Sequence, residues 1–430
     1  MNSLQLFLPC AAGVEDFLAA EVHALTGLQG QDLLTRRGGV LATASWRDAM
    51  LLNLHCRLAQ RVLVQLSYGE YRTEQDLYRA ASEVAWEIWF TPKQTIKVEV
   101  TAQHSPLTSL NFAALKIKDA VCDRFRDKRG ARPDVDTQWP DVRLYAHLTT
   151  DTLSLYIDTS GEPLFKRGWR EDKGEAPLKE TLAAAMIAAC GWAEGEDDLL
   201  PLYDPCCGSG TIAIEAAQIA CNIAAGSLRR FAFEKMLPYQ PHVWTALKQE
   251  ADSQVVKPEP GQAPLVFGSD VSHRMVDFAQ RNAQRAGVAD VIEFRGGDAL
   301  QRLPPSDVPG VMLINPPYGE RIAVAGVAGV SGAEQGARSG AREEAHTEDG
   351  GEFFSQLATH WKKNYSGWTA WVLTPDLKLP SKMRLKESRR VPMWNGPLEC
   401  RLFKFDMVKG SARGKGGQTP IQDNHLNGDS

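Results

Sequence analysis

A glycine-rich loop between an apolar run and a helical pattern constrains the fold more than any other feature of this sequence. Residues 199–203 are mostly apolar, residues 204–210 read DPCCGSG, and residues 211–220 have helical spacing. Glycine permits positive φ and lets a ligand approach the backbone. The N–H groups that begin the following helix favour a carboxylate or phosphate. The order strand, tight turn, helix therefore predicts an α/β unit that binds a nucleotide-like ligand, although a plain tight turn has the same local pattern.

Acidic residues close three successive apolar runs. Asp204 closes the first run, and Asp270 and Asp298 close the next two. A carboxylate after the second strand of such a unit can accept hydrogen bonds from ribose hydroxyls, and the third acid suits an adenine amino group. Each acid taken singly could be a helix cap or a turn residue. Far more residues separate Asp204 from Asp270 than the ~20 of a minimal dinucleotide unit, so we expect an insertion at residues 222–261.

A fourth apolar run ends in the sequence Asn315, Pro316, Pro317, Tyr318. An amine on a heteroaromatic ring is a poor nucleophile because its lone pair is delocalised. Two acceptors, the Asn315 side chain and the Pro316 backbone carbonyl, would help it accept a methyl group. Consecutive prolines stiffen this loop, and Tyr318 can stack on an extruded base. A rigid turn after a buried strand is the alternative interpretation, but the preceding glycine loop favours methyl transfer to nitrogen, which depends mainly on positioning.

Both loops resemble the motifs of one known family. DPCCGSGTIAIEAA and INPPYGER are similar to the cofactor and catalytic motifs of class I S-adenosylmethionine-dependent RNA methyltransferases that carry a THUMP domain. The resemblance extends to about residue 408 and corresponds to the N-terminal half of larger bacterial members that modify 23S ribosomal RNA. Further segments resemble the THUMP signature helix, the domain junction, the helix over the methionine end of the cofactor and the closing strand region, at residues 111–125, 155–170, 176–184 and 395–400.

The resemblance implies a fold, a cofactor and a site. The expected fold is α/β, with a Rossmann-like class I methyltransferase domain preceded by an α+β module that contains a THUMP RNA-binding domain. The expected reaction is S-adenosylmethionine-dependent N-methylation of an RNA base, at guanine N2 in 23S ribosomal RNA. The target amine and base would be held by Asn315, Pro316, Pro317 and Tyr318. The cofactor would be lined by Asp204, Pro205, Cys206, Gly208, Gly210, Thr211, Asp270 and Asp298.

Other functions fit the same residues. An N6-adenine methyltransferase of DNA or RNA would use the same loop chemistry, and the residues alone do not separate it from a guanine-N2 enzyme. A protein glutamine methyltransferase could hold an amide nitrogen in the same way. A non-catalytic RNA-binding or ribosome-assembly factor with a vestigial pocket belongs to another class, and the intact loops argue against it.

We expect four segments along the chain. Residues 1–44 form a ferredoxin-like segment, residues 45–158 the THUMP domain, and residues 159–408 the methyltransferase domain. The stretches at 323–351 and 409–430 are poor in aromatic and branched apolar residues, and we expect a low-complexity insert and a disordered tail there.

Composition narrows the environment and the partners. The eight cysteines form no C-x-x-C pair, so neither a zinc site nor a disulfide framework is indicated. No run approaches the ~20 apolar residues of a membrane span, and the N-terminus lacks a signal core, so we expect a cytoplasmic protein without membrane contact. The net charge of −5 requires segregated basic residues if RNA is the partner. Basic clusters at 116–132 and 378–390 are compatible with phosphate contacts or with solvated faces, and the expected partner is 23S ribosomal RNA or a large-subunit assembly intermediate.

Overall fold

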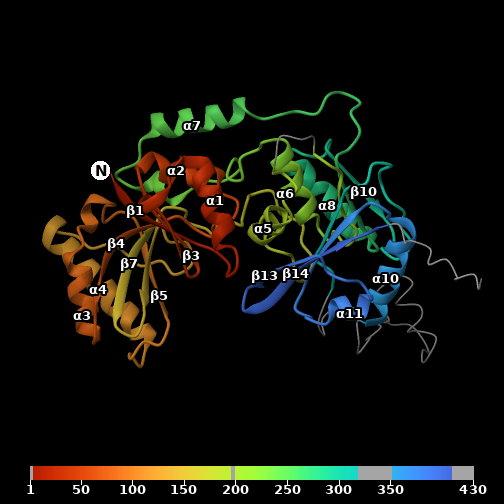
Figure 1. Ribbon diagram of the computed structural model, residues 1–430. Coiled ribbons are helices and arrows are strands. Elements are labelled where there is room, and N and C mark those ends of the chain that lie inside the picture. Colours follow the sequence, from red (N-terminus) through yellow and green to blue (C-terminus); the bar gives the residue numbers. More distant parts are fainter. Residues whose placement is uncertain (1–2, 195–198, 318–350, 409–430) are drawn as a thin grey trace, which may run out of the picture.

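The structure, a computed structural model, describes residues 3–194, 199–317 and 351–408. The described chain forms two seven-stranded sheets, one in each half. The two halves lie side by side, and helix α7 (Pro241–Ser253) reaches from the second half over the first (Figure 1). Within the described residues, no helix is both long enough and apolar enough to cross a membrane. The expected insert at 323–351, apart from residue 351, and the expected tail lie outside the described residues.

The first sheet has the strand order β2-β3-β1-β4-β7-β6-β5, and its neighbouring strands are antiparallel except for the parallel pair β5 and β6. Its strands are β1 (Leu4–Pro9), β2 (Leu33–Arg36), β3 (Gly39–Ala44), β4 (Leu63–Glu70), β5 (Ile96–Ala102), β6 (Val142–Leu148) and β7 (Thr152–Asp158). Its helices are α1 (Glu15–Thr26), α2 (Trp46–His55), α3 (Glu74–Glu83) and α4 (Leu110–Arg129). Because Leu6 of β1 pairs with Val64 of β4, the N-terminal segment and the strands that follow it share one continuous sheet.

The second sheet has the order β10-β9-β8-β11-β12-β14-β13, with parallel pairing from β10 to β12 and antiparallel pairing beyond it. Its strands are β8 (Leu202–Asp204), β9 (Val266–Asp270), β10 (Ile292–Gly296), β11 (Val311–Ile314), β12 (Thr369–Thr374), β13 (Arg389–Asn395) and β14 (Leu398–Asp406). Its further helices are α5 (Glu180–Cys190), α6 (Thr211–Ala220), α8 (His273–Arg285), α10 (Gly351–Asn364) and α11 (Leu379–Met383).

Both faces of the second sheet are covered by helices. Leu313 belongs to the larger hydrophobic core, which contains the buried residues of α5, α6 and α8. Met312 and Ile314, its neighbours along β11, belong to a second core that contains the buried residues of α10. Successive strand residues point to opposite faces, so this alternation places one helical layer on each side of the sheet. The predicted α/β class with a mostly parallel, doubly covered sheet is confirmed.

The insertion at residues 222–261 docks on the N-terminal half. Phe233 of this insertion packs against Trp46 of α2, with ring centroids 6.4 Å apart, and against Trp244 of α7, at 5.0 Å. All three side chains are buried, and they belong to the larger core, which extends from β1 to β14. The core of the first half and one face of the second sheet are therefore a single hydrophobic cluster.

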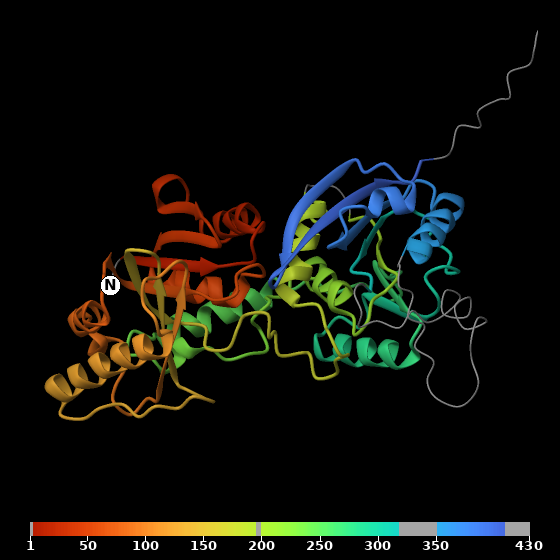
Figure 2. The ribbon, with the colours of Figure 1, turned by 90° about the horizontal axis from the view of Figure 1, so that it is seen from below.

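A second crossing joins the hairpin of β13 and β14 to the N-terminal half. Seen from below, this blue hairpin reaches toward the red N-terminal elements (Figure 2). The N–H of Trp394 donates to the carbonyl of Ala12 at 3.2 Å. Gly13 has a φ of +87°, and a Cβ at this position would lie 2.3 Å from the carbonyl oxygen of Pro392. A side chain there would collide with backbone, so this close approach requires glycine.

Candidate active site at the switch point of the second sheet

The two sequence motifs meet at the point where the strand order of the second sheet reverses. From β8 the chain continues outward through β9 and β10, then returns to β11 on the other side of β8. The register pairs Val311 with Leu202 and Met312 with Tyr203, so Asp204 and Asn315 lie at the same carboxyl edge of adjacent strands. Open α/β sheets bind their ligands in the crevice outside this edge at such a point. The arrangement brings the glycine loop and the Asn-Pro-Pro loop together.

The glycine loop folds as a tight turn that ends at the start of α6. Gly208 and Gly210 both have positive φ, +53° and +92°. A Cβ on Gly210 would meet Ala279 Cβ at 3.0 Å, which shows that α6 and α8 pack closely there. A Cβ on Gly208 would meet no described atom within 4 Å, so the loop has open space beside it at this position. Gly210 is the N-cap of α6, and in the described chain no side chain caps that helix, which leaves its first N–H groups for a ligand.

Two of the three predicted acids contact the loop itself. Asp204 Oδ1 accepts a hydrogen bond from the N–H of Cys206 at 3.0 Å. Asp270 accepts from the N–H of Gly208 at 3.0 Å and from that of Ser272 at 2.9 Å. Asp298 lies after β10, and its Oδ1 accepts from the N–H of Leu300 at 2.9 Å. Asp270 therefore ties the turn after β9 to the glycine loop.

Burial controls the charge of Asp204. Its side chain is removed from water, and this burial, together with the negative charge of Asp270, raises the pKa of Asp204 to about 8, although the Cys206 N–H opposes the change. Burial likewise raises the pKa of Asp270 above its usual value, against the hydrogen bonds that Ser272 and Gly208 donate to it. The edge of the sheet thus carries two carboxyl groups that resist ionisation in the cofactor-free protein.

The side-chain oxygen of Asn315 is an acceptor that no donor of the described residues reaches. Its Oδ1 is buried and has no hydrogen-bond partner within the described residues. Pro316 is buried and Pro317 is half-buried, so the loop is packed on the protein. Tyr318 lies outside the described residues. A buried carbonyl oxygen without a donor is uncommon in native proteins, and this one lies at the switch point of the sheet.

The remaining predicted loop residues pack into the turn. Pro205 offers its carbonyl to the Ser269 hydroxyl at 3.5 Å, and Thr211 is buried at the first position of α6. Cys206 is half-buried beside the second core. Burial raises the pKa of the Cys206 thiol well above its usual value, and the neighbouring carboxyl groups of Asp204 and Asp270 add to this. A thiol that stays protonated is a poor nucleophile.

Arg170 contacts the loop and pairs with Glu180, and the sequence analysis singled out neither residue. Arg170 donates to the hydroxyls of Ser209 and Thr211, each at 2.5 Å, and its Nε donates to Glu180 Oε1 at 2.8 Å. Glu180 begins α5, which starts four residues later than the segment resembling the helix over the methionine end. The segment 155–170 had been assigned only to a domain junction, and no local pattern shows that one of its arginines reaches the loop.

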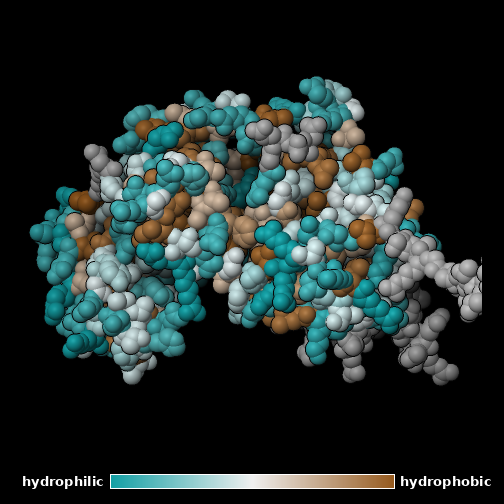
Figure 3. All heavy atoms as spheres, in the orientation of Figure 1, coloured by the Kyte–Doolittle hydropathy of each residue, from teal (hydrophilic) through white to brown (hydrophobic). Residues whose placement is uncertain are grey.

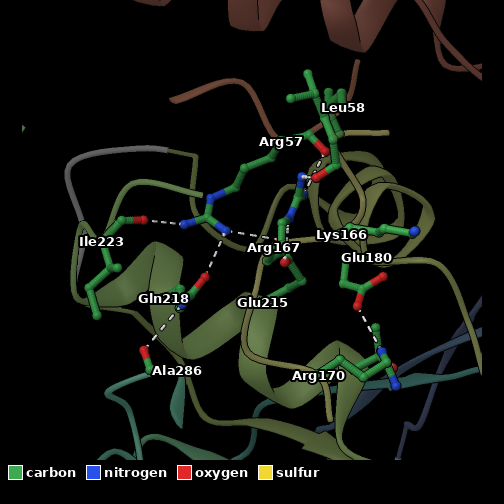
Figure 4. A network of polar contacts seen from close by, with 12 residues as sticks. Arg57, Leu58, Lys166, Arg167, Arg170, Glu180, Glu215, Gln218, Ile223 and Ala286 are labelled. Carbon is green, nitrogen blue, oxygen red and sulfur yellow. Dashed lines mark hydrogen bonds and ion pairs between the residues drawn. The ribbon is translucent and has the colours of Figure 1, made fainter. Parts of the chain in front are cut away.

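A buried charge cluster joins helix α6 to the N-terminal half (Figure 4). Glu215 of α6 is fully buried and binds Arg57, which follows α2, at 3.0 Å. It also binds Arg167 from the interdomain segment, at 3.0 Å. Burial alone would raise the pKa of Glu215, but the two guanidinium groups lower it below its usual value. Helix α6 thus carries the glycine loop at its start and an interdomain ion cluster one turn further on.

The predicted basic clusters lie on exposed surfaces. On α4, Ile117, Val121 and Phe125 are buried, and most basic residues of the helix point away from them. Hydrophilic residues cover much of the surface over α3 and α4 (Figure 3). In the second cluster, Arg389 and Arg390 are exposed at the start of β13. Both surfaces are accessible to a polyanion.

Comparison with known families divides the chain into three matches. Residues 5–63 match the RlmL ferredoxin-like domain, residues 71–158 the THUMP domain, and residues 167–328 the RMKL-like methyltransferase domain. The ribosomal RNA large subunit methyltransferase K/L of Psychromonas ingrahamii is 36% identical over 404 residues, which cover 94% of this chain and 50% of that protein. The chain thus spans about half the length of the curated relatives it matches.

Two solved structures resemble nearly the whole chain. SMU.472, solved in complex with SAH, is 27% identical and superposes with a TM-score of 0.78 over 96% of this chain and 100% of its own. A predicted N6-adenine-specific DNA methylase from Listeria monocytogenes is 28% identical, with a TM-score of 0.76 over 94% of this chain and 96% of its own. The arrangement of both sheets is therefore shared with proteins of similar size.

Proposed function

We propose that this chain is a THUMP-domain methyltransferase that transfers the methyl group of S-adenosylmethionine to a base nitrogen of RNA, at N2 of a guanine in 23S ribosomal RNA. Three observations support this reaction: the matches to the THUMP and methyltransferase domains, the similarity to ribosomal RNA large subunit methyltransferases K/L, and the orphaned Oδ1 of Asn315. The position of Asn315 carries the proposal, because an amine substrate needs an acceptor at the switch point, and this one has no donor among the described residues.

The residues at the carboxyl edge fit S-adenosylmethionine. The open space beside Gly208 and the uncapped start of α6 suit a ligand with an anionic end, and SMU.472 was solved with SAH. In this proposal Asp204, Pro205, Cys206, Gly208, Gly210 and Thr211 line the cofactor, Asp270 accepts from the ribose hydroxyls, and Asp298 accepts from the adenine amino group. When bound, the cofactor supplies a sulfonium methyl group that is open to displacement by nitrogen.

The chain's own residues would orient the amine. The Oδ1 of Asn315 and the backbone carbonyl of Pro316 each accept one N–H of the exocyclic amine, which directs the nitrogen lone pair toward the methyl donor. The stiff proline pair fixes these two acceptors before the base arrives. Tyr318 would stack on the base and keep the amine in its plane.

RNA is the proposed partner, and the THUMP match supports it. The exposed basic residues of α4 and the start of β13 would contact phosphates, either of free 23S ribosomal RNA or of a large-subunit assembly intermediate. Such a substrate places the protein in the cytoplasm.

N6-methylation of adenine is the second candidate. The similarity to the Listeria monocytogenes protein described as an N6-adenine-specific DNA methylase favours it. An exocyclic amine of adenine presents the same two N–H groups to Asn315 and Pro316. The choice of guanine rests on the ribosomal RNA relatives.

The test uses the full chain with labelled S-adenosylmethionine and unmodified 23S ribosomal RNA, followed by mass spectrometry of the nucleosides. We expect N2-methylguanosine at a single position. Detection of N6-methyladenosine would change the assigned target base from guanine to adenine. RNA that stays unlabelled although the protein binds the cofactor would overturn the proposal that RNA is the substrate.

The variant Asn315→Ala should bind the cofactor as the wild type does and lose methyl transfer by about 100-fold or more, since it removes a positioned acceptor. The matched control is Asn364→Ala at the end of α10, where the amide bonds to His360 of the same helix, and its activity should be retained. Full activity of Asn315→Ala would refute the role of this side chain.

A further inference from the structure

Arg170 links the start of helix α6 to the start of α5. Its Nη1 donates to Ser209 Oγ and its Nη2 to Thr211 Oγ1, each at 2.5 Å, so one guanidinium group spans the two residues that flank Gly210. Its Nε donates to Glu180 of α5 at 2.8 Å. The side chain of Arg170 is 12% exposed, and the fork geometry of arginine fixes both hydroxyls at once.

The charges around Arg170 indicate that stability alone does not explain its placement. A cation beside a helix N-terminus opposes the helix dipole, which favours an anion there. Glu180, whose side chain is 3% exposed, compensates the charge from the opposite side. The pair therefore places a buried carboxylate and a partly buried guanidinium next to the loop, where apolar side chains would pack with less desolvation.

The hydrogen bonds of Arg170 set the direction of the two hydroxyls. A hydroxyl has one hydrogen to donate and two lone pairs to accept with. Because Ser209 and Thr211 each accept from Arg170, the hydrogen of each hydroxyl remains available as a donor. These two donors adjoin the first N–H groups of α6, which no side chain of the described protein caps. Such a cluster of donors matches a carboxylate.

We propose that Arg170 is a positioning residue for the amino-acid end of the cofactor, acting through Ser209 and Thr211. It need not touch the ligand. It orients two hydroxyl donors and the start of α6 toward the carboxylate, while Glu180 keeps its own charge balanced. This inference rests on the proposed function, because it assumes a cofactor with a methionine-like end in the glycine loop.

The test compares two ligands that differ in that end. S-adenosylhomocysteine carries the amino acid, whereas 5′-methylthioadenosine keeps the adenosine and the sulfur without it. Dissociation constants are measured by titration calorimetry on the full chain. Arg170→Met should raise the dissociation constant of S-adenosylhomocysteine by about 10- to 100-fold. This is the usual effect of losing hydrogen bonds that a charged group organises. Binding of 5′-methylthioadenosine should stay within about twofold of the wild type.

Two further variants make the result independent of folding defects. Arg170→Met leaves Glu180 buried without its cation, so the double variant R170M/E180Q removes both charges and should show the same ligand selectivity. The matched control is Arg281→Met, which breaks an ion pair between α8 and Asp172, two residues beyond Arg170 in the same segment. Its affinity for both ligands should equal that of the wild type.

Selective loss of the amino-acid ligand in both Arg170 variants supports the inference. Equal losses for the two ligands, or no loss for either, overturn it and leave the proposed function standing. A wild-type chain that binds neither ligand overturns the proposed function and this inference together.

Discussion

At the scale of single residues, Asp204 stands out because its environment disfavours the ionised carboxylate. The carboxyl group is fully buried, accepts one backbone N–H from Cys206 and lies close to a second acid, Asp270. Among the described residues, no cation lowers the pKa of Asp204 to offset this. Buried polar groups that lack such compensation are found at functional sites more often than elsewhere, because selection maintains them for ligand contacts.

The raised pKa of Asp204 predicts a pH-dependent stability. In the unfolded chain an aspartate titrates near ~4, and in the folded protein the pKa of Asp204 is about 8. Ionisation therefore disfavours the folded state, so stability falls as pH rises from ~4 to about 8 and then levels off. Asp204→Asn should remove this loss and melt higher than the wild type by ~5 °C or more at pH 9, with a smaller difference at pH 5.

Thermal unfolding of the cofactor-free protein followed by circular dichroism across pH 5–9 measures this difference. Wild-type and variant melting temperatures that run parallel across the range would contradict the raised pKa. The same variant should bind S-adenosylhomocysteine more weakly than the wild type, because Asp204 lines the proposed cofactor site.

Residue types with distinctive local chemistry could be predicted from the sequence, and those defined by distant contacts could not. Glycine with positive φ, a strand-ending acid and a proline pair leave a local pattern, and the structure brings Asp204, Gly208, Gly210 and Asn315 to one edge. Arg170 has no such pattern, since its partners Ser209 and Thr211 are 39 and 41 residues away. Only the folded structure shows that Arg170 contacts the loop.

At the scale of elements, helix α6 supports both the glycine loop and the buried ion cluster. Its first turn follows the glycine loop, and its second turn presents Glu215 to Arg57 and Arg167. Because the helix is rigid, the glycine loop and Glu215 keep a fixed relative position, so a displacement of Glu215 would also move the loop.

Glu215→Gln should destabilise the protein by about 3–5 kcal/mol, because it leaves two buried guanidinium groups without their anion. The matched control is Glu250→Gln on α7, which removes an exposed interdomain pair with Arg47 at 3.9 Å. That change should cost less than ~1 kcal/mol. Denaturation in guanidinium chloride measures both, and similar losses for the two variants would show that burial does not decide the strength of this interdomain contact.

The strands of the second sheet were foreseeable and the docking of the insertion was not. Apolar runs that end in Asp204, Asp270 and Ile314 indicate where parallel strands stop, and helix α6 has the predicted bounds of residues 211–220. Strand β8 is shorter than its apolar run, starting at Leu202. The contact of Phe233 and Trp244 with Trp46 depends on tertiary packing between segments far apart in the chain, which periodicity does not encode.

At the scale of the whole molecule, the two sheets share one hydrophobic cluster. The larger core includes residues of both halves, and the insertion and the β13–β14 hairpin both cross between them. Domains that fold separately usually meet through smaller and more polar surfaces. The two halves should therefore unfold together.

Differential scanning calorimetry of the cofactor-free chain should show one endotherm, since unfolding either half would expose the core of the other. Far-ultraviolet circular dichroism and tryptophan fluorescence should report the same midpoint, because buried tryptophans lie in both halves, among them Trp86 and Trp361. Two resolved endotherms, or midpoints that differ between the two probes, would show that the halves are thermodynamically separate.

The ion pair between Arg57 and Glu215 joins the two halves, so it also restricts which segments can be exchanged between related genes. A catalytic half transplanted onto a foreign recognition module would bring Glu215 and Arg167 without the arginine that completes their cluster. It would also present Phe233 to a surface that lacks Trp46. We therefore expect exchange between relatives to preserve stability only where α2, Arg57 and the insertion are carried over as one block.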